Sequence, residues 1–374
     1  MNESYPAARH VAPRVQAHFA RHRDAVGAEI GAAVPDTDAI AALIDAAFWA
    51  SLRREEDYVP RISFALVAPD RVPRPLLFER PLPLAPAVLT RLAPAVERPG
   101  IHLGVSRQEG ELRVWGATRV IPPFCCVLEV VAPGLLVVKH SRDDESGKFV
   151  NVAVLEGDEV KVVDERASAL PDCPPFLSAL LGHDLPEAAG ASPNVLVQLA
   201  VSMRGHGRGG ALLVVPSGSD AWTESIARPI PYAVSPPFAA LADLLATAPD
   251  GRRHEWHESL GHLVEGIAGV TAVDGATVIT ERFELLAFGA KVTRRDGRPP
   301  IEQVTVTEPV EGAAEAVVHP AELGNTRHYA GAQFAHDQRD AVALVASQDG
   351  RFTVFVWSPC EGRVHAHRVE TLLL

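Results

Sequence analysis

The stretch from Glu322 to Gly350 carries residue types and spacings that suit phosphate binding, in the sequence ELGNTRHYAGAQFAHDQRDAVALVASQDG. Thr326 is expected to cap a short helix over residues 327–336. Arg327 and His328 then fall in its first turn, where free backbone N–H groups and the positive end of the helix dipole favour an anion. A guanidinium and an imidazole added there would hold a phosphate group. The alternative is that Arg327 and His328 are ordinary exposed side chains at the start of a helix.

A buried strand is predicted directly after this helix, at residues 341–346 with the sequence AVALVA. A continuous apolar run is typical of a strand that is covered on both faces. It ends in Ser347, Gln348, Asp349 and Gly350, and polar residues at the end of such a strand often line a ligand site. A simple hairpin turn is the alternative.

A second polar signal lies earlier in the chain, where Asp274, Gly275 and Ala276 follow a predicted helix and lead a pair of strands, TVIT and ELLAF. The helix is indicated by apolar residues at helical spacing between Trp256 and Ile267. A carboxylate at such a junction can hold a divalent metal or accept a hydroxyl proton, and the glycine lets a ligand approach the backbone. Read alone, Asp-Gly is also a common turn dipeptide.

A glycine-rich segment, GHGRGG at residues 205–210, lies between a predicted helix over residues 194–204 and a predicted strand over residues 211–215. Phosphate loops of the Rossmann and Walker types run in the other order, from strand through glycines to helix. We therefore interpret the segment as the C-terminal turn of a helix.

Size and composition favour two globular domains. The chain has 374 residues, of which 47% are hydrophobic and 22% charged. A formal net charge of -12 argues against nucleic acid or an anionic membrane as partner, because neutralising phosphates needs a basic excess. A small anion such as a nucleotide needs only a local basic patch.

The cytoplasm is the expected compartment. Cysteines occur without metal-binding spacing, and the adjacent Cys125 and Cys126 are expected to be small core residues. The beginning of the sequence has no apolar signal region, and no apolar run is long enough to cross a membrane.

The predicted fold class is α/β and α+β, with domains at residues 1–180 and 190–374. The first is an α+β domain, with a core-facing helix beginning near Asp36 and short β-type runs up to Asp164. The second has a mixed central β-sheet surrounded by helices. The boundary is expected within residues 165–193, which are rich in Pro, Ala and Gly.

Polar residues of the first domain give weaker evidence of a functional site. Lys139 with His140, and the charged loop over residues 142–148, are interpreted as solvated edge and turn.

Taken in order, several motifs resemble those of the diadenylate cyclase (DAC) family. These are DGA at residues 274–276, the AFGAKV strand, ELG-TRH around Arg327, and an apolar strand ending in S-x-D-G. The family signatures are a DGA motif, a GTRHRAA motif and a strand ending in SEE or similar, and the resemblance covers about residues 193–357. The first half, with its ISFALV and ELRVWGA runs, is similar to the probable sensor domain called DACNV, which precedes such modules in some bacterial proteins.

The resemblance implies an enzyme that condenses two ATP molecules into cyclic di-AMP and releases pyrophosphate, with Mg²⁺ or Mn²⁺ required. Each protomer would bind one ATP, and two protomers of a homo-oligomer would meet face to face. Each 3′-hydroxyl then attacks the α-phosphate held by the other subunit. Catalysis of this kind is mainly in-line positioning and neutralisation of phosphate charge.

By position, the resemblance assigns catalytic roles to Asp274, Arg327 and His328. Asp274 would orient the 3′-hydroxyl and hold the metal, with Asp349 as a second metal ligand. The residues implied to contact the nucleotide are Gly275, Ala276, Thr326, Tyr329, Ser347 and Asp349.

The chain departs from the family pattern at several positions. Tyr329 replaces the second arginine of the motif, which removes a fixed positive charge. Asn325 reads as an inserted residue, and Gln348 replaces an acidic residue. The connection from Thr293 to Leu323 is longer than usual. It could cover the site, block the face-to-face dimer, or supply substitute side chains from Arg294, Arg295 or His319.

Three functional hypotheses follow. The first is an active cyclase making cyclic di-AMP or a related product. The second is a catalytically inactive module that binds ATP or another nucleotide as a sensor, which Tyr329 and Gln348 favour. The third is a structural or protein-interaction role, favoured by the apolar excess and acidic charge.

Overall fold

The computed structural model describes residues 4–26, 32–54, 58–141, 149–169, 174–181, 192–247 and 253–374. They form two compact units, each described by itself. Unit 1 comprises residues 1–163 with Leu374, and unit 2 comprises residues 164–373. The predicted boundary region, residues 165–193, falls in the first part of unit 2.

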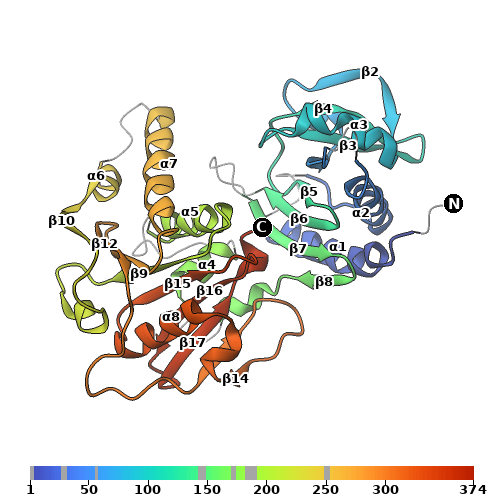
Figure 1. The fold of residues 1–374 in the computed structure, drawn as a ribbon. Coiled ribbons are helices and arrows are strands. Elements are labelled where there is room, and N and C mark those ends of the chain that lie inside the picture. The colour runs from blue at the N-terminus through green and yellow to red at the C-terminus, as the bar shows by residue number, and fades with distance from the viewer. Residues whose placement is uncertain are drawn as a thin grey trace. The chain divides into compact units, whose positions relative to one another are not determined.

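Unit 1 contains one mixed sheet whose strand order is β2-β4-β3-β1-β5-β6-β7-β8 (Figure 1). Among the described strands, β1 and β3 pair in parallel and the other neighbours are antiparallel. Its elements are α1 (Pro6–Val26), α2 (Thr37–Ser51), β1 (Ile62–Leu66), η1 (Pro69–Arg71), β2 (Leu76–Pro83), α3 (Pro86–Val96), β3 (His102–Gln108), β4 (Glu111–Thr118), β5 (Cys126–Ala132), β6 (Leu135–Ser141), β7 (Phe149–Glu156) and β8 (Glu159–Val162).

The helices of unit 1 cover the sheet with an apolar face. Asp36 caps α2, accepting a hydrogen bond from Ala39 N at 2.7 Å, and Ile40, Leu43 and Ile44 are fully buried behind it. Tyr5 stacks on Phe48 of α2, so the start of α1 is fixed to the second helix.

Unit 2 contains a second mixed sheet with the order β10-β12-β11-β9-β15-β16-β17-β13-β14. Parallel pairing occurs between β9 and β11 and between β13 and β17. Its strands are β9 (Gly210–Val215), β10 (Tyr232–Phe238), β11 (Ala276–Thr280), β12 (Leu285–Ala290), β13 (Val304–Thr307), β14 (Ala316–Val318), β15 (Val342–Ala346), β16 (Phe352–Ser358) and β17 (Arg363–Arg368). Its helical elements are η2 (Glu165–Ala169), α4 (Pro175–Leu180), α5 (Ser192–Gly205), η4 (Ala221–Ser225), α6 (Ala240–Ala246), α7 (Arg253–Val270), η5 (Pro320–Leu323), α8 (Thr326–Asp337) and η6 (Glu370–Leu372).

Helix α8 lies on one face of this sheet, across β15, β16 and β17 (Figure 1). Its buried residues share a core with alternate residues of the central strands, such as Leu213 of β9 and Val345 of β15. Gly331 makes the contact close, because a Cβ at this position would lie 2.8 Å from Val345 Cγ2. The helix backbone therefore rests almost directly on the sheet.

The fold class and the main predicted elements are confirmed. The expected strand at residues 341–346 is β15, the strands around TVIT and ELLAF are β11 and β12, and the helix near Asp36 is α2. The patterns missed β2 and α3 in unit 1, and β10, β13 and β14 in unit 2. Strand β10 ends at Phe238. In the missed strands, prolines and long exposed stretches interrupt the alternation of apolar and polar residues by which a strand is predicted.

Cys125 and Cys126 are buried as predicted, at the start of β5. Burial raises the pKa of Cys126 to about 12, so this thiol stays protonated and packs as a small apolar group. Cys173 lies outside the described residues. Within the described ranges, no helix combines the length and apolar character needed to cross a membrane.

A buried histidine in unit 2 makes stability depend on pH. Burial lowers the pKa of His367 to about 4, with His365 acting in the same direction, and Thr307 Oγ1 lies 2.6 Å from its Nδ1. Unfolding returns this imidazole to its usual pKa near 6.5, so the unfolded chain binds more protons between these values. The free energy of unfolding of unit 2 is therefore expected to fall as the pH drops from about 6.5 to about 4.

We expect His367→Asn to remove roughly 3 kcal/mol of that pH dependence, since an amide can keep the bond to Thr307 but does not titrate. Urea unfolding followed at several pH values measures this. The control is His262→Asn, at an exposed position of α7 in the same unit. Parallel stability curves for wild type and His367→Asn would contradict the assignment.

Candidate functional site

A cavity of about 470 Å³ lies between the N-terminal half of α8 and the sheet of unit 2. Four segments of the chain line it: strand β9, the junction before β11, the end of β12 with the two residues after it, and the start of α8. The lining residues are Ala211, Leu213, Asp274, Gly275, Ala276, Ala290, Lys291, Val292, Asn325, Thr326, Arg327, Ala330 and Gly331. The predicted Asp274 and Arg327 motifs therefore border the same cavity.

The start of α8 differs by one residue from the sequence prediction. Asn325, not Thr326, is the N-cap, and its Oδ1 accepts a hydrogen bond from Arg327 N at 3.1 Å. Thr326 is the first helical residue and is exposed at the cavity. The residue that reads as an insertion thus sets where the helix begins, and its side chain also lies 3.2 Å from His328 Nδ1.

The junction before β11 is held by a close approach of two backbones. Gly275 has a φ of +108°, and a Cβ there would lie 2.5 Å from the carbonyl carbon of Gly289 in β12. Glycine is therefore required at position 275 by the neighbouring strand. Asp274, one residue earlier, is exposed with its side chain at the cavity.

Two cationic side chains border the cavity. Arg327 is half-buried, and the glycine-rich segment before β9 makes room for it: a Cβ on Gly209 would lie 3.2 Å from Arg327 Nη1. Lys291 follows directly after β12 and is exposed. Against these, Asp274 is the one carboxylate in the lining, within the part of the chain that the structure describes. The formal charge of the lining is positive, which suits an anion carrying more than one negative charge.

Lys291 and Asn325 are functional candidates that the sequence prediction did not assign. Lys291 stands in the AFGAKV motif, so its place after a strand that pairs with β11 is the signal that could have identified it.

His328 lies under α8, away from the cavity lining. It is 1% exposed, its ring packs edge-on against Phe355, and burial lowers its pKa below the ordinary value. Gly324 permits this position, because a Cβ there would meet His328 Nδ1 at 2.9 Å. The structure thus gives His328 a supporting position beneath the helix start, where it is neutral near pH 7.

Tyr329 also lies outside the cavity lining and packs against the core shared by α8 and the sheet. Its ring centroid is 6.2 Å from that of His319.

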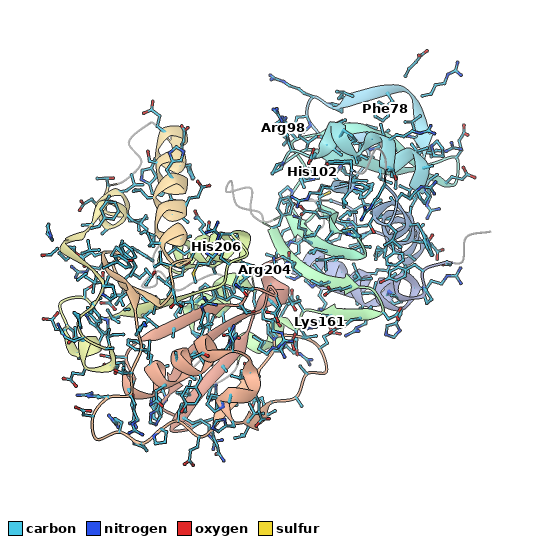
Figure 2. All side chains as sticks on the ribbon, in the orientation of Figure 1. Phe78, Arg98, His102, Lys161, Arg204 and His206 are labelled. Carbon is cyan, nitrogen blue, oxygen red and sulfur yellow. The ribbon has the colours of Figure 1, made fainter. Side chains whose placement is uncertain are left out.

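Ser347 and Asp349 form a turn of their own after β15. Ser347 Oγ donates to Asp349 Oδ1, and Asp349 pairs with Arg351 at 3.3 Å. The bond from Ser347 holds the pKa of Asp349 below its usual range, and Arg351 adds to this. Arg204 at the end of α5 (Figure 2) donates to Gly350 O at 3.2 Å, and this bond fixes the turn to that helix. Neither Ser347 nor Asp349 belongs to the cavity lining.

The long connection from Thr293 to Leu323 extends the sheet. It contains β13, which pairs with β17, and the short strand β14. Arg295 is held by Glu224 at 2.5 Å, and its backbone N donates to Asp337. None of the expected substitutes, Arg294, Arg295 and His319, is in the described lining of the cavity.

Among the described residues of the lining, Asp274 is the carboxylate that could hold a divalent metal. Mg²⁺ and Mn²⁺ prefer oxygen ligands and commonly use one or two carboxylates together with phosphate oxygens of a nucleotide. Asp274 supplies such a carboxylate, with the Thr326 hydroxyl and the Asn325 amide also at the lining. Asp349 does not fit, because its carboxylate is held by Ser347 and Arg351 outside the lining.

Unit 1 has a larger cavity, of about 770 Å³, between β2, β4 and the end of α3. Its wall is mostly apolar, with Phe78 of β2 (Figure 2) and Leu92 of α3 among its residues, and Arg74 and Arg119 at its border. Its size and lining are in the range of small-molecule sites.

The close approach at Gly275 gives a stability test. Gly275→Ala is expected to cost about 3 kcal/mol, since the new methyl group meets the Gly289 backbone and the residue keeps a positive φ. Gly218→Ala is the matched control, because it has a φ of +74° and nothing within 4 Å. It should cost about 1 kcal/mol, the strain of the left-handed conformation alone. If urea unfolding gives equal losses of unfolding free energy for the two variants, the close approach of Gly275 to Gly289 does not restrict the residue at position 275.

Comparison with known families finds a match for part of unit 1. Residues 29–119 match the model of a family described as "Probable sensor domain DACNV". A search of curated proteins finds no match. The matched region contains α2, β1, α3 and β3, and most of the wall of the unit 1 cavity. The part of this chain from residue 29 to residue 119 is therefore similar to a sensor domain.

Proposed function

We propose that unit 2 binds ATP in the cavity under α8 and condenses two ATP molecules into cyclic di-AMP, under control of unit 1 as a sensor. The observation that carries the proposal is the meeting of Asp274 and Arg327 at one cavity. These residues belong to the motifs that resemble the diadenylate cyclase family, and they are distant in sequence. The sensor match of residues 29–119 supports the association with such an enzyme.

The triphosphate would lie against the start of α8. The Arg327 guanidinium offers donors there, the start of α8 adds positive potential, and Lys291 adds a second cation. The cavity volume of about 470 Å³ is in the range that small-molecule ligands occupy. Holding the phosphates at fixed points leaves the α-phosphate in a defined position, which is the main contribution that catalysis of this kind needs.

Asp274 would act on the attacking hydroxyl. As the 3′-oxygen of one ATP forms its bond to the α-phosphorus of the other, the bond to the bridging oxygen of pyrophosphate breaks, and the hydroxyl proton must leave. A carboxylate at the rim of the cavity can orient that hydroxyl and accept the proton. When bound, Mg²⁺ or Mn²⁺ would neutralise phosphate charge, held by Asp274 and the phosphates themselves.

One cavity of this size suits one ATP, so the second must come from another copy of the chain. A two-fold arrangement with facing cavities would bring each 3′-hydroxyl to the opposite α-phosphate, and turnover would then depend on protein concentration.

A second candidate function is a nucleotide sensor without turnover. Two observations favour it. Tyr329, at the place of a phosphate-binding arginine, packs against the core outside the cavity lining, and Asp349 is held by its own turn, also outside that lining. Such a site keeps Arg327 and Lys291 to bind phosphates. It lacks the second arginine of the family motif and the second carboxylate that would hold a metal.

The test is incubation of the full chain with ATP and Mn²⁺, with cyclic di-AMP measured by mass spectrometry. We expect product from the wild type and a loss of about 100-fold or more in Asp274→Asn, which keeps the size of the side chain but removes the base. Arg327→Ala should weaken ATP binding by roughly 10- to 100-fold, the value of lost charge-assisted hydrogen bonds. Calorimetry measures that loss.

Arg294→Ala is the matched control, because this arginine is exposed and lies outside the described lining. It should leave both activity and binding unchanged. Binding that depends on Arg327, without product at any protein concentration, would favour the sensor function. Absence of nucleotide binding would contradict both candidates.

A further inference from the structure

Three histidines of unit 1 converge in space from two distant segments. His18 and His22 lie on α1, and His140 lies on β6. One ligand atom from each imidazole lies within 4.8 Å of those of the other two. Their ring centroids are separated by 4.5 Å for His18 and His22, 5.3 Å for His18 and His140, and 5.2 Å for His22 and His140.

Regular structure brings these side chains together. Positions i and i+4 of a helix share one face, so His18 and His22 point the same way from α1. His140 is opposite Cys126 in the β5–β6 ladder, near the end of its strand. The prediction of a solvated edge at His140 was wrong, because this side chain is 4% exposed.

One of the rings is oriented as metal-binding histidines usually are. His140 Nδ1 lies 3.1 Å from the carbonyl oxygen of Ser141, to which it can donate a proton. That bond fixes the tautomer with the lone pair on Nε2, an arrangement that raises the basicity of the ligand nitrogen.

Among the described residues, aromatic rings lie against the cluster. His18 is 2% exposed, and the ring of Phe124 stacks on His140 with centroids 5.3 Å apart and reaches His22 at 5.9 Å. Phe19 closes another side, 6.0 Å from His140. No carboxylate or thiolate belongs to the group, as far as the described residues extend. The neutral imidazole is the form of histidine that binds metals.

We propose that His18, His22 and His140 form a binding site for a divalent transition metal of the zinc class. Three imidazole nitrogens with no charged ligand suit Zn²⁺, Co²⁺ or Ni²⁺, with water or a small anion as the fourth ligand. At the usual Zn–N distance near 2.0 Å, tetrahedral nitrogens lie about 3.3 Å apart. A bound ion would therefore draw the ligand nitrogens together from the present limit of 4.8 Å.

The site is distinct from the region that matches the sensor family. His18 and His22 precede residue 29, and His140 follows residue 119, so the metal joins segments on both sides of the matched part. A bound ion would therefore link α1 to β6 and stabilise unit 1. The proposal is independent of any nucleotide chemistry in unit 2.

The experiment uses the full chain, stripped with a chelator and then titrated with Zn²⁺ or Co²⁺. We expect one tight ion per chain, visible absorption bands typical of tetrahedral Co²⁺, and a rise in the unfolding temperature of unit 1 with Zn²⁺. His22→Gln should weaken binding at least about 100-fold, since even residues that only support a metal ligand cost 10- to 100-fold when removed.

His10→Gln is the matched control, an exposed histidine of the same helix. It should bind as the wild type does. If His22→Gln fails to fold, X-ray absorption on the zinc-loaded wild type decides, because three imidazole ligands give a recognisable scattering pattern. No tight ion, a tight ion without imidazole ligands, or equal binding in His22→Gln and His10→Gln would overturn the proposal and leave the histidines as aromatic packing.

Discussion

The candidate site of unit 2 depends on how closely α8 packs on its sheet. Gly331 removes the side chain that would separate helix from strand, and Gly275 lets the backbone before β11 approach β12. Both contacts are short because neither position carries a Cβ. As a result the start of α8 and the Asp274 junction border a common space, and a larger residue at either glycine would move one wall of it.

Sequence patterns were sufficient for the elements with strong periodicity. Apolar runs identified β15, β11 and β12, and the order of the motifs predicted that Asp274 and Arg327 belong together. Sequence patterns could not predict on which side of α8 each polar side chain lies. His328 follows Arg327 directly, yet the helix turns about 100° per residue, so one borders the cavity and the other is buried below.

The turn after β15 illustrates a different limit. Ser347 and Asp349 are near the end of a central strand, where polar residues often line a site, but they satisfy each other and Arg351. Local hydrogen bonds of this kind depend on backbone geometry after the strand, which residue type does not determine. In unit 1, residues that were not predicted to form a site come together. His18 and His22 meet His140 through tertiary packing, and the only signal in the sequence is the helical spacing of the first two.

The ends of the unit 2 sheet also bear on how copies of this chain could meet. One edge strand, β10, carries Pro236 and Pro237, which have no N–H to donate to an added strand, and the other, β14, is three residues long. Such edges discourage growth of a sheet from molecule to molecule. Contacts between copies are thus directed to side-chain surfaces, and a continuous intermolecular sheet is disfavoured from either end.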